Sequence, residues 1–160
     1  MGLRIQLCRL AFCSIALGSI ALGSVAVCGF AYGQDKPPIE ELKGVWQAES
    51  IEVAGNRAPE EPTKLMRFTF NEKAVLIRGN FQDEREESCT YKLDATKSPK
   101  EIDIQPPTEK EPILGIYRIV DGKLEICLRK ESKERPKDFK TSKDDPQNVL
   151  VKFKREPAQK

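Results

Sequence analysis

Histidine is absent from this chain of 160 residues, and its absence removes the most common routes to catalysis. Without histidine there is no Ser-His-Asp or Cys-His nucleophile, and the most frequent general base is missing. Most zinc sites are excluded too, because two cysteines remain outside the N-terminal segment and cannot supply three or four ligands alone. The sequence therefore predicts no catalytic residues, no metal site and no cofactor.

Acidic residues are lacking from the first 33 residues, whose charged groups are Arg4 and Arg9. An apolar run, Leu10–Ala31, follows and ends in Ala31-Tyr32-Gly33, with small residues at the positions that signal peptidase reads. This order predicts a secretory signal over residues 1–33. The length of this run is close to the roughly 20 apolar residues that span a bilayer, so an uncleaved membrane anchor is the alternative. In that case we expect the chain to contact the membrane through this segment only. Both interpretations predict an extracytoplasmic location.

The rest of the chain lacks an excess of either charge. The whole sequence has 27 Lys and Arg against 25 Asp and Glu, so removing the two leader arginines leaves 25 of each sign. Nucleic-acid-binding domains usually carry a clear basic excess, so we expect no nucleic acid partner. Interspersed charges of both signs are typical of a solvated surface.

Cysteine is scarce beyond the leader, where Cys89 and Cys127 are the two present. An oxidising compartment would favour a disulfide between them, worth about 4 kcal/mol from loop closure. Strand alternation places Cys89 on an apolar face with Tyr91 and Leu93, whereas Cys127 falls on a polar face. This difference argues against a bridge unless a bulge turns one side chain. Two separate buried thiols are the alternative.

Apolar and polar residues alternate through most of a domain at 42–156, after a short linker at 34–41, and this period of two predicts strands. The predicted strands are Gly44–Val53, Lys64–Phe70, Ala74–Gly79, Ser88–Asp94, Glu101–Gln105, Ile113–Val120, Lys123–Lys130 and Asn148–Lys154. A change of register predicts a bulge near Ser50, and Asp121-Gly122 predicts a tight hairpin. Loops are predicted at 58–63 and 131–147, with Phe139 anchoring the second on the barrel rim.

Eight short strands, linked mostly by hairpins, describe an antiparallel up-and-down meander. Closing it into a barrel removes the exposed edges that an open sheet would keep. The predicted fold is all-β, an eight-stranded barrel just wide enough to be filled by side chains or to hold one small ligand, and a family resemblance given below is the main reason to expect closure. A β-sandwich fits the same strand count and is the alternative.

The first strand begins at Leu42-Lys43-Gly44-Val45-Trp46, which resembles the entry of a lipocalin barrel, where a helical turn precedes Gly-x-Trp. In that superfamily the tryptophan closes the narrow end of the barrel and a basic residue from near the chain end covers it. The resemblance implies this structural role for Trp46, covered by Lys154 or Arg155. A cation over an indole contributes about 0.5–2 kcal/mol.

Further motifs resemble an uncharacterised family of exported lipocalin-like domains found mainly in planctomycete bacteria. The matching motifs are Leu42–Trp46, Gly55, Ser98–Asp103, Gly115–Tyr117, Leu124–Cys127, Glu134–Pro136 with Phe139, and Phe153–Arg155. Their order and spacing cover nearly the whole domain. The resemblance implies a lipocalin-like fold and export, and it implies no activity because the family has none assigned.

Four side chains at strand period are candidates for lining a ligand cavity, namely Met66, Phe68, Phe70 and Tyr117. Such residues are equally typical of an ordinary core, so both interpretations stay open. The function expected first is an extracytoplasmic lipocalin-like module that binds a small apolar ligand or a cell-envelope protein, with catalysis disfavoured. The alternatives are an envelope-associated structural protein and an enzyme that uses carboxylates, the candidates being Glu84, Glu86, Glu87, Asp144 and Asp145.

Overall fold

A computed structural model describes residues 38–80, 83–130 and 133–157 of the chain. The predicted signal segment, 1–33, and the first residues of the predicted linker lie outside the described residues. The elements in chain order are α1 (Pro38–Leu42), β1 (Gly44–Val53), β2 (Asn56–Arg57), α2 (Glu60–Leu65), β3 (Arg67–Phe70), β4 (Ala74–Asn80), β5 (Asp83–Asp94), β6 (Lys100–Gln105), β7 (Ile113–Val120), β8 (Lys123–Arg129) and β9 (Asn148–Arg155). No helix in these three segments is long and apolar enough to cross a membrane.

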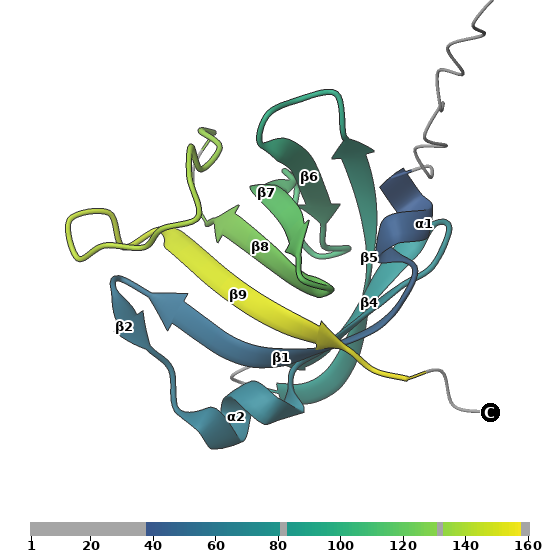
Figure 1. Cartoon of the computed structure of the whole chain (residues 1–160), viewed down its shortest axis with the longest axis horizontal. Helices are drawn as coiled ribbons and strands as arrows, with labels where there is room; N and C mark the ends of the chain where they lie inside the picture. The colour runs from purple at the N-terminus through teal and green to yellow at the C-terminus, as the bar shows by residue number, and fades with distance from the viewer. Residues whose placement is uncertain (1–37, 81–82, 131–132, 158–160) are drawn as a thin grey trace, which may run out of the picture. The chain divides into compact units, whose positions relative to one another are not determined.

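Strands β1 and β3–β9 close into one antiparallel barrel, which confirms the predicted fold class (Figure 1). Each barrel strand pairs with the next one along the chain, and β9 returns to pair with β1 from Trp46–Arg155 to Val53–Val149. Within the described residues the barrel therefore has eight strands, while the two-residue β2 pairs with the end of β1. The β1–β9 pairing excludes a two-layer sandwich.

Two local backbone features set the register of this wall. The β1–β9 pairing shifts between Ala48 and Ser50, which confirms the predicted bulge and lets the apolar residues on both sides of it reach the core. The β7–β8 hairpin turns at Asp121 and Gly122, whose φ angles of 51° and 74° are the left-handed values of a type I′ turn. The predicted hairpin is confirmed as well.

Inward-pointing side chains form one connected apolar core, to which α1 contributes Leu42 at one end of the barrel. Its fully buried large members are Trp46, Tyr117, Phe70, Phe153, Leu42, Ile51, Ile102, Ile104, Leu124, Ile126 and Val75. A second, smaller cluster of Ile116, Cys127 and Leu150 lies on the opposite face of β7–β9, because neighbouring residues of a strand point to opposite sides. The loop between β8 and β9 covers this outer cluster with Phe139.

The predicted loop at 58–63 and the predicted start of the next strand are wrong, because residues Glu60–Leu65 form α2. Pro62 is tolerated there since it lies in the first turn, where a backbone N–H has no acceptor within the helix. The hydroxyl of Thr63 donates to the carbonyl of Pro59 at 2.8 Å, which stabilises the same turn. Acidic residues at its start and Lys64 at its end suit the helix dipole.

The charged stretch Gln82–Glu87 is predicted to precede a strand, but from Asp83 onward it belongs to β5. Here β4 and β5 form a long ribbon, with Glu86 directly opposite Arg78 in the ladder. Opposite charges across a ladder support pairing on a solvated face, so an apolar alternation is unnecessary at this point.

Candidate functional site

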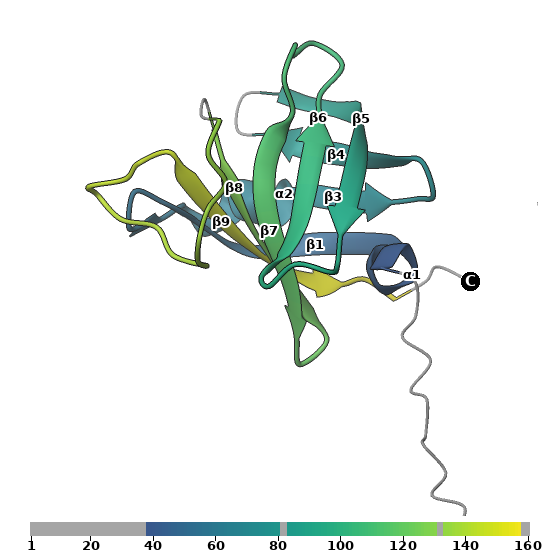
Figure 2. The same ribbon diagram turned by 90° about the horizontal axis from the view of Figure 1, so that it is seen from above.

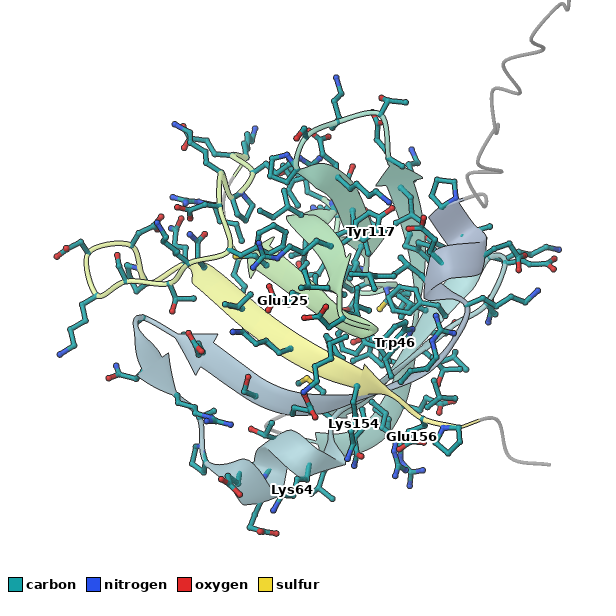
Figure 3. All side chains as sticks on the ribbon, viewed as in Figure 1. Trp46, Lys64, Tyr117, Glu125, Lys154 and Glu156 are labelled. Atoms are coloured by element: carbon teal, nitrogen blue, oxygen red, sulfur yellow. The ribbon has the colours of Figure 1, made fainter. Side chains whose placement is uncertain are left out.

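Trp46 lies at the α1 end of the barrel and is almost fully buried, at 1% exposure. Its indole N–H donates to the carbonyl of Leu42 at 2.6 Å. The guanidinium of Arg155 lies over the indole, 4.3 Å from the ring centroid, and donates to the main-chain carbonyl of Lys43 at 2.6 Å. Arg155 thus occupies the covering position, whereas Lys154 is exposed near the end of β9 (Figure 3).

The four cavity candidates all lie in the packed core. The ring of Phe68 is centred 4.8 Å from that of Phe153 and 6.2 Å from that of Phe70, so these aromatic side chains contact one another. Met66 joins the same core at 9% exposure. Of the four, Tyr117 also borders a groove at the surface.

This groove has a volume of about 830 Å³ and opens on the outside of the barrel near α1. The groove is formed by α1, the turn before β6 with the first residue of β6, the end of β7, the loop between β8 and β9, and the last residue of β9. We call the described part of that loop, residues 133–147, the flap. The lining residues are Glu40, Glu41, Ser98, Pro99, Lys100, Tyr117, Arg118, Ile119, Lys137, Asp138, Phe139 and Arg155.

Arg135 attaches the flap to the barrel wall. Its guanidinium contacts the carboxylates of Glu101, at 3.3 Å, and Asp103, at 2.6 Å. It also donates to the main-chain carbonyls of Ile102 and Gly115, at 3.2 and 2.5 Å. One side chain thereby joins the flap to both β6 and β7, which positions the flap as one wall of the groove.

Phe139 packs against the outer cluster and holds the flap there. The prediction that Phe139 anchors this loop is confirmed, but its predicted position on the barrel rim is wrong. The cause is Cys127, which shares its face of the strand with Glu125 and Arg129 but lies under Phe139 at 0% exposure. The guanidinium of Arg118 covers the other side of the Phe139 ring, 4.2 Å from its centroid, and pairs with Glu125. The sequence signal for this contact is an aromatic residue within a charged loop.

The two cysteines are free and buried on opposite faces of the wall. Burial raises the pKa of the Cys89 thiol and of the Cys127 thiol to about 11. A thiol with a raised pKa is protonated at neutral pH and therefore a poor nucleophile. Neither cysteine belongs to the groove, and neither suits a catalytic role.

Carboxylates at the groove are each engaged by a cation. Glu41 pairs with Lys100 at 2.9 Å, Asp138 with Lys140 at 3.5 Å, and Glu40 with a lysine of the following turn at 3.8 Å. The carboxylates that the sequence offered for catalysis lie elsewhere, in β5 and at the far end of the flap. Among the described residues, no group of three or more His, Cys, Asp or Glu side chains is placed to hold a metal ion.

Tyr117 lies under the groove at 0% exposure, and its hydroxyl has no hydrogen-bond partner in the described part of the chain. Burial, with smaller effects from Glu41 and Asp94, raises the pKa of the Tyr117 phenol to about 12. The ammonium of Lys100 lies 5.9 Å from the ring centroid. A phenol in this environment stays neutral and acts as packing, not as a base.

Comparison of the chain with protein-family models, curated proteins and solved structures finds no match. The functional argument therefore depends on the geometry of the chain itself. That geometry consists of a filled barrel, a tryptophan-closed end, and a charged groove formed by α1, the β7 end and the flap.

Proposed function

We propose that this chain is exported and acts outside the cytoplasm as a lipocalin-like binding module that contacts a protein partner through the groove. The observation that supports this proposal is the position of the groove, about 830 Å³ in volume, outside a barrel whose inward aromatic side chains pack against one another. All four predicted cavity residues lie in the apolar core, and Phe68 and Phe70 take part in this aromatic packing, which disfavours a small apolar ligand inside the barrel.

Binding suits the groove better than catalysis. Its carboxylates are paired with lysines, and the one phenol beneath it is buried and neutral. General acid–base chemistry needs two ionisable groups that converge on a substrate with suitable pKa values. The arrangement instead combines apolar side chains with fixed charges around a concave surface, as binding sites do.

The experiment that tests this proposal is ligand mapping by NMR. The ¹⁵N-labelled protein is screened against a library of small fragments and short peptides, and perturbed amides are assigned. We expect perturbations around Lys100, Ile119 and Phe139. Perturbations centred on Phe68 and Phe70 would restore the interior ligand, and the absence of any responding fragment would contradict a binding role for the groove.

Export is tested separately by N-terminal sequencing and cell fractionation. A mature chain that begins at Gln34 and lies outside the cytoplasm supports the secretory signal and the relation to the exported lipocalin-like family. A chain that keeps Met1 in the membrane fraction would favour the anchor. Recovery in the cytoplasm would refute both.

A further inference from the structure

The last residues of strand β7 extend beyond the first residue of its antiparallel neighbour, β6. Among the described residues, they therefore pair with a strand on one side only, which is β8. β6 starts at Lys100, which pairs with Tyr117, whereas β7 runs on to Val120 and pairs with β8 along its whole end. Figure 2 shows the β7–β8 hairpin projecting beyond the end of β6. Residues 118–120 therefore form a free sheet edge, and two of them line the groove.

The hairpin geometry decides which main-chain groups point out of this edge. In a two-residue type I′ hairpin, the residues that flank the turn, Val120 and Lys123, exchange both main-chain hydrogen bonds. Because antiparallel bonding alternates, Arg118 also bonds toward β8, and Ile119 directs its N–H and C=O away from β8. The β6 ladder ends before it reaches Ile119, and no other main-chain group among the described residues bonds there.

Apolar side chains flank these unpaired groups. Ile119 and Val120 are 37% and 44% exposed, which is unusual for large hydrophobic residues of this chain. Phe139 lies on the other face of the same edge, against Arg118. An extended chain docked along the edge would place alternate side chains against Ile119 on one face and Phe139 on the other.

The charges of the groove favour an acidic segment. Its carboxylates are engaged by lysines, whereas Lys137 has no carboxylate partner among the residues that the structure describes. Arg155 bonds main-chain carbonyls and lies over Trp46, and no carboxylate within residues 38–80, 83–130 and 133–157 forms an ion pair with it. A carboxylate brought into the groove would meet two such cations.

We propose that the β7 edge binds an extended, acidic segment of a partner protein, which adds a strand to the barrel sheet at Ile119. This inference rests on the proposed function, since it names the partner and the binding mode of the same groove. The main chain of Ile119 supplies hydrogen bonds, the flanking apolar side chains supply contact area, and Lys137 and Arg155 select for acidic residues.

The first part of the test concerns the free protein. Amide hydrogen exchange of the full chain is followed by NMR at residues 118–120. We expect the Ile119 amide to exchange at least tenfold faster than the amides of Arg118 and Val120, which are bonded within the hairpin. Equal protection of all three amides would overturn the proposal, because Ile119 would already have a partner.

The second part uses random twelve-residue peptides displayed on phage and selected against the full chain. We expect the selected peptides to be acidic and to protect the Ile119 amide from exchange when bound. Ile119→Pro removes the N–H that points outward, and proline is tolerated at such an edge position. This variant should weaken binding at least tenfold, whereas the matched variant Ile119→Val should bind within about twofold of the wild type.

Charge selection is tested by Lys137→Glu, which should weaken binding of the same peptides about fivefold, with Lys110→Glu at the opposite end of the barrel as the control. Failure to select any peptide, or binding unaffected by Ile119→Pro, would overturn strand addition. Dimerisation of the free chain that Ile119→Pro abolishes would assign the edge to a second copy and overturn it too. Fragment binding in the groove does not depend on strand addition, so the NMR fragment screen tests the proposed function independently of these results.

Discussion

Replacing Arg135 with methionine should release the flap without unfolding the barrel. The substitution removes a guanidinium that contacts two carboxylates and two main-chain carbonyls, while a chain of similar apolar character remains. Hydrogen bonds to charged groups contribute about 1.5–3 kcal/mol each, but contacts of one group are not additive. Because Arg135 and its two carboxylate partners are 22–30% exposed, water compensates part of the loss.

We therefore expect the closed flap to lose about 2 kcal/mol, which raises the population of open flap about 30-fold. Cys127 reports this opening, because Phe139 covers it and burial raises the pKa of its thiol to about 11. The assay is alkylation with N-ethylmaleimide under native conditions, followed by peptide mapping. Cys89, in the barrel core, is the internal control for global unfolding.

The rate of Cys127 alkylation should rise about 30-fold in Arg135→Met and should stay far above the rate at Cys89, because flap opening exposes Cys127 whereas only unfolding of the barrel exposes Cys89. Lys133→Met is the matched flap variant, since that lysine is 88% exposed and its pairing with Glu111 is 4.0 Å long, so it should change neither rate. An unchanged Cys127 rate in Arg135→Met would refute the role of Arg135 in holding the flap. Equal absolute rates at the two cysteines would show that the flap and barrel open together.

Three further results are expected. Arg155→Met should lower the free energy of unfolding by about 1 kcal/mol, because the contact with Trp46 is lost. Urea titration followed by indole fluorescence measures this change. A decrease no larger than that of the control Lys154→Met would contradict the role of Arg155. Tyr117→Phe should raise stability by about 1 kcal/mol, because it removes a buried hydroxyl without a partner. The folded pKa of Tyr117, about 12, lies above its ordinary value of 10.0, so its ionisation does not reduce stability below pH 10 but lowers the free energy of unfolding as pH rises from 10 toward 12. Tyr117→Phe should therefore flatten the alkaline decline seen in urea titrations. Gly115→Ala should destabilise the fold by about 2 kcal/mol in the same assay, because the added Cβ would meet a main-chain oxygen at 2.8 Å, and an unaltered midpoint would show that the strands adjust.

Local patterns were enough to predict much of the barrel. Polar–apolar alternation located the strands, and Asp121-Gly122 located the β7–β8 hairpin, because both signals depend on neighbours in sequence. The predicted strand boundaries were wrong at α2 and at the start of β5. Interactions within one helical turn stabilise α2, and charged cross-strand pairs take the place of apolar alternation in β5. Closure was inferred mainly from the resemblance to lipocalin-like domains and also from the need to remove free edges, and the β1–β9 pairing provides it.

The candidate site was less accessible to prediction. Met66, Phe68 and Phe70 alternate as a cavity wall would, but alternation cannot distinguish a wall from a packed core. Cys127 was predicted to lie on a polar face because Glu125 and Arg129 share that face of the strand, while the residue that covers it, Phe139, is distant in sequence.

The sequence by itself determined an all-β chain with apolar faces that must close on themselves, because strand alternation and turn geometry are local properties. It also excluded histidine-based chemistry. The tertiary structure decided where the groove lies, since the groove depends on the position at which β6 begins, on the extension of β7 beyond that position, and on the flap, which is distant in sequence. These three features depend on the relative positions of segments that are distant in sequence. No local pattern of residues encodes those positions.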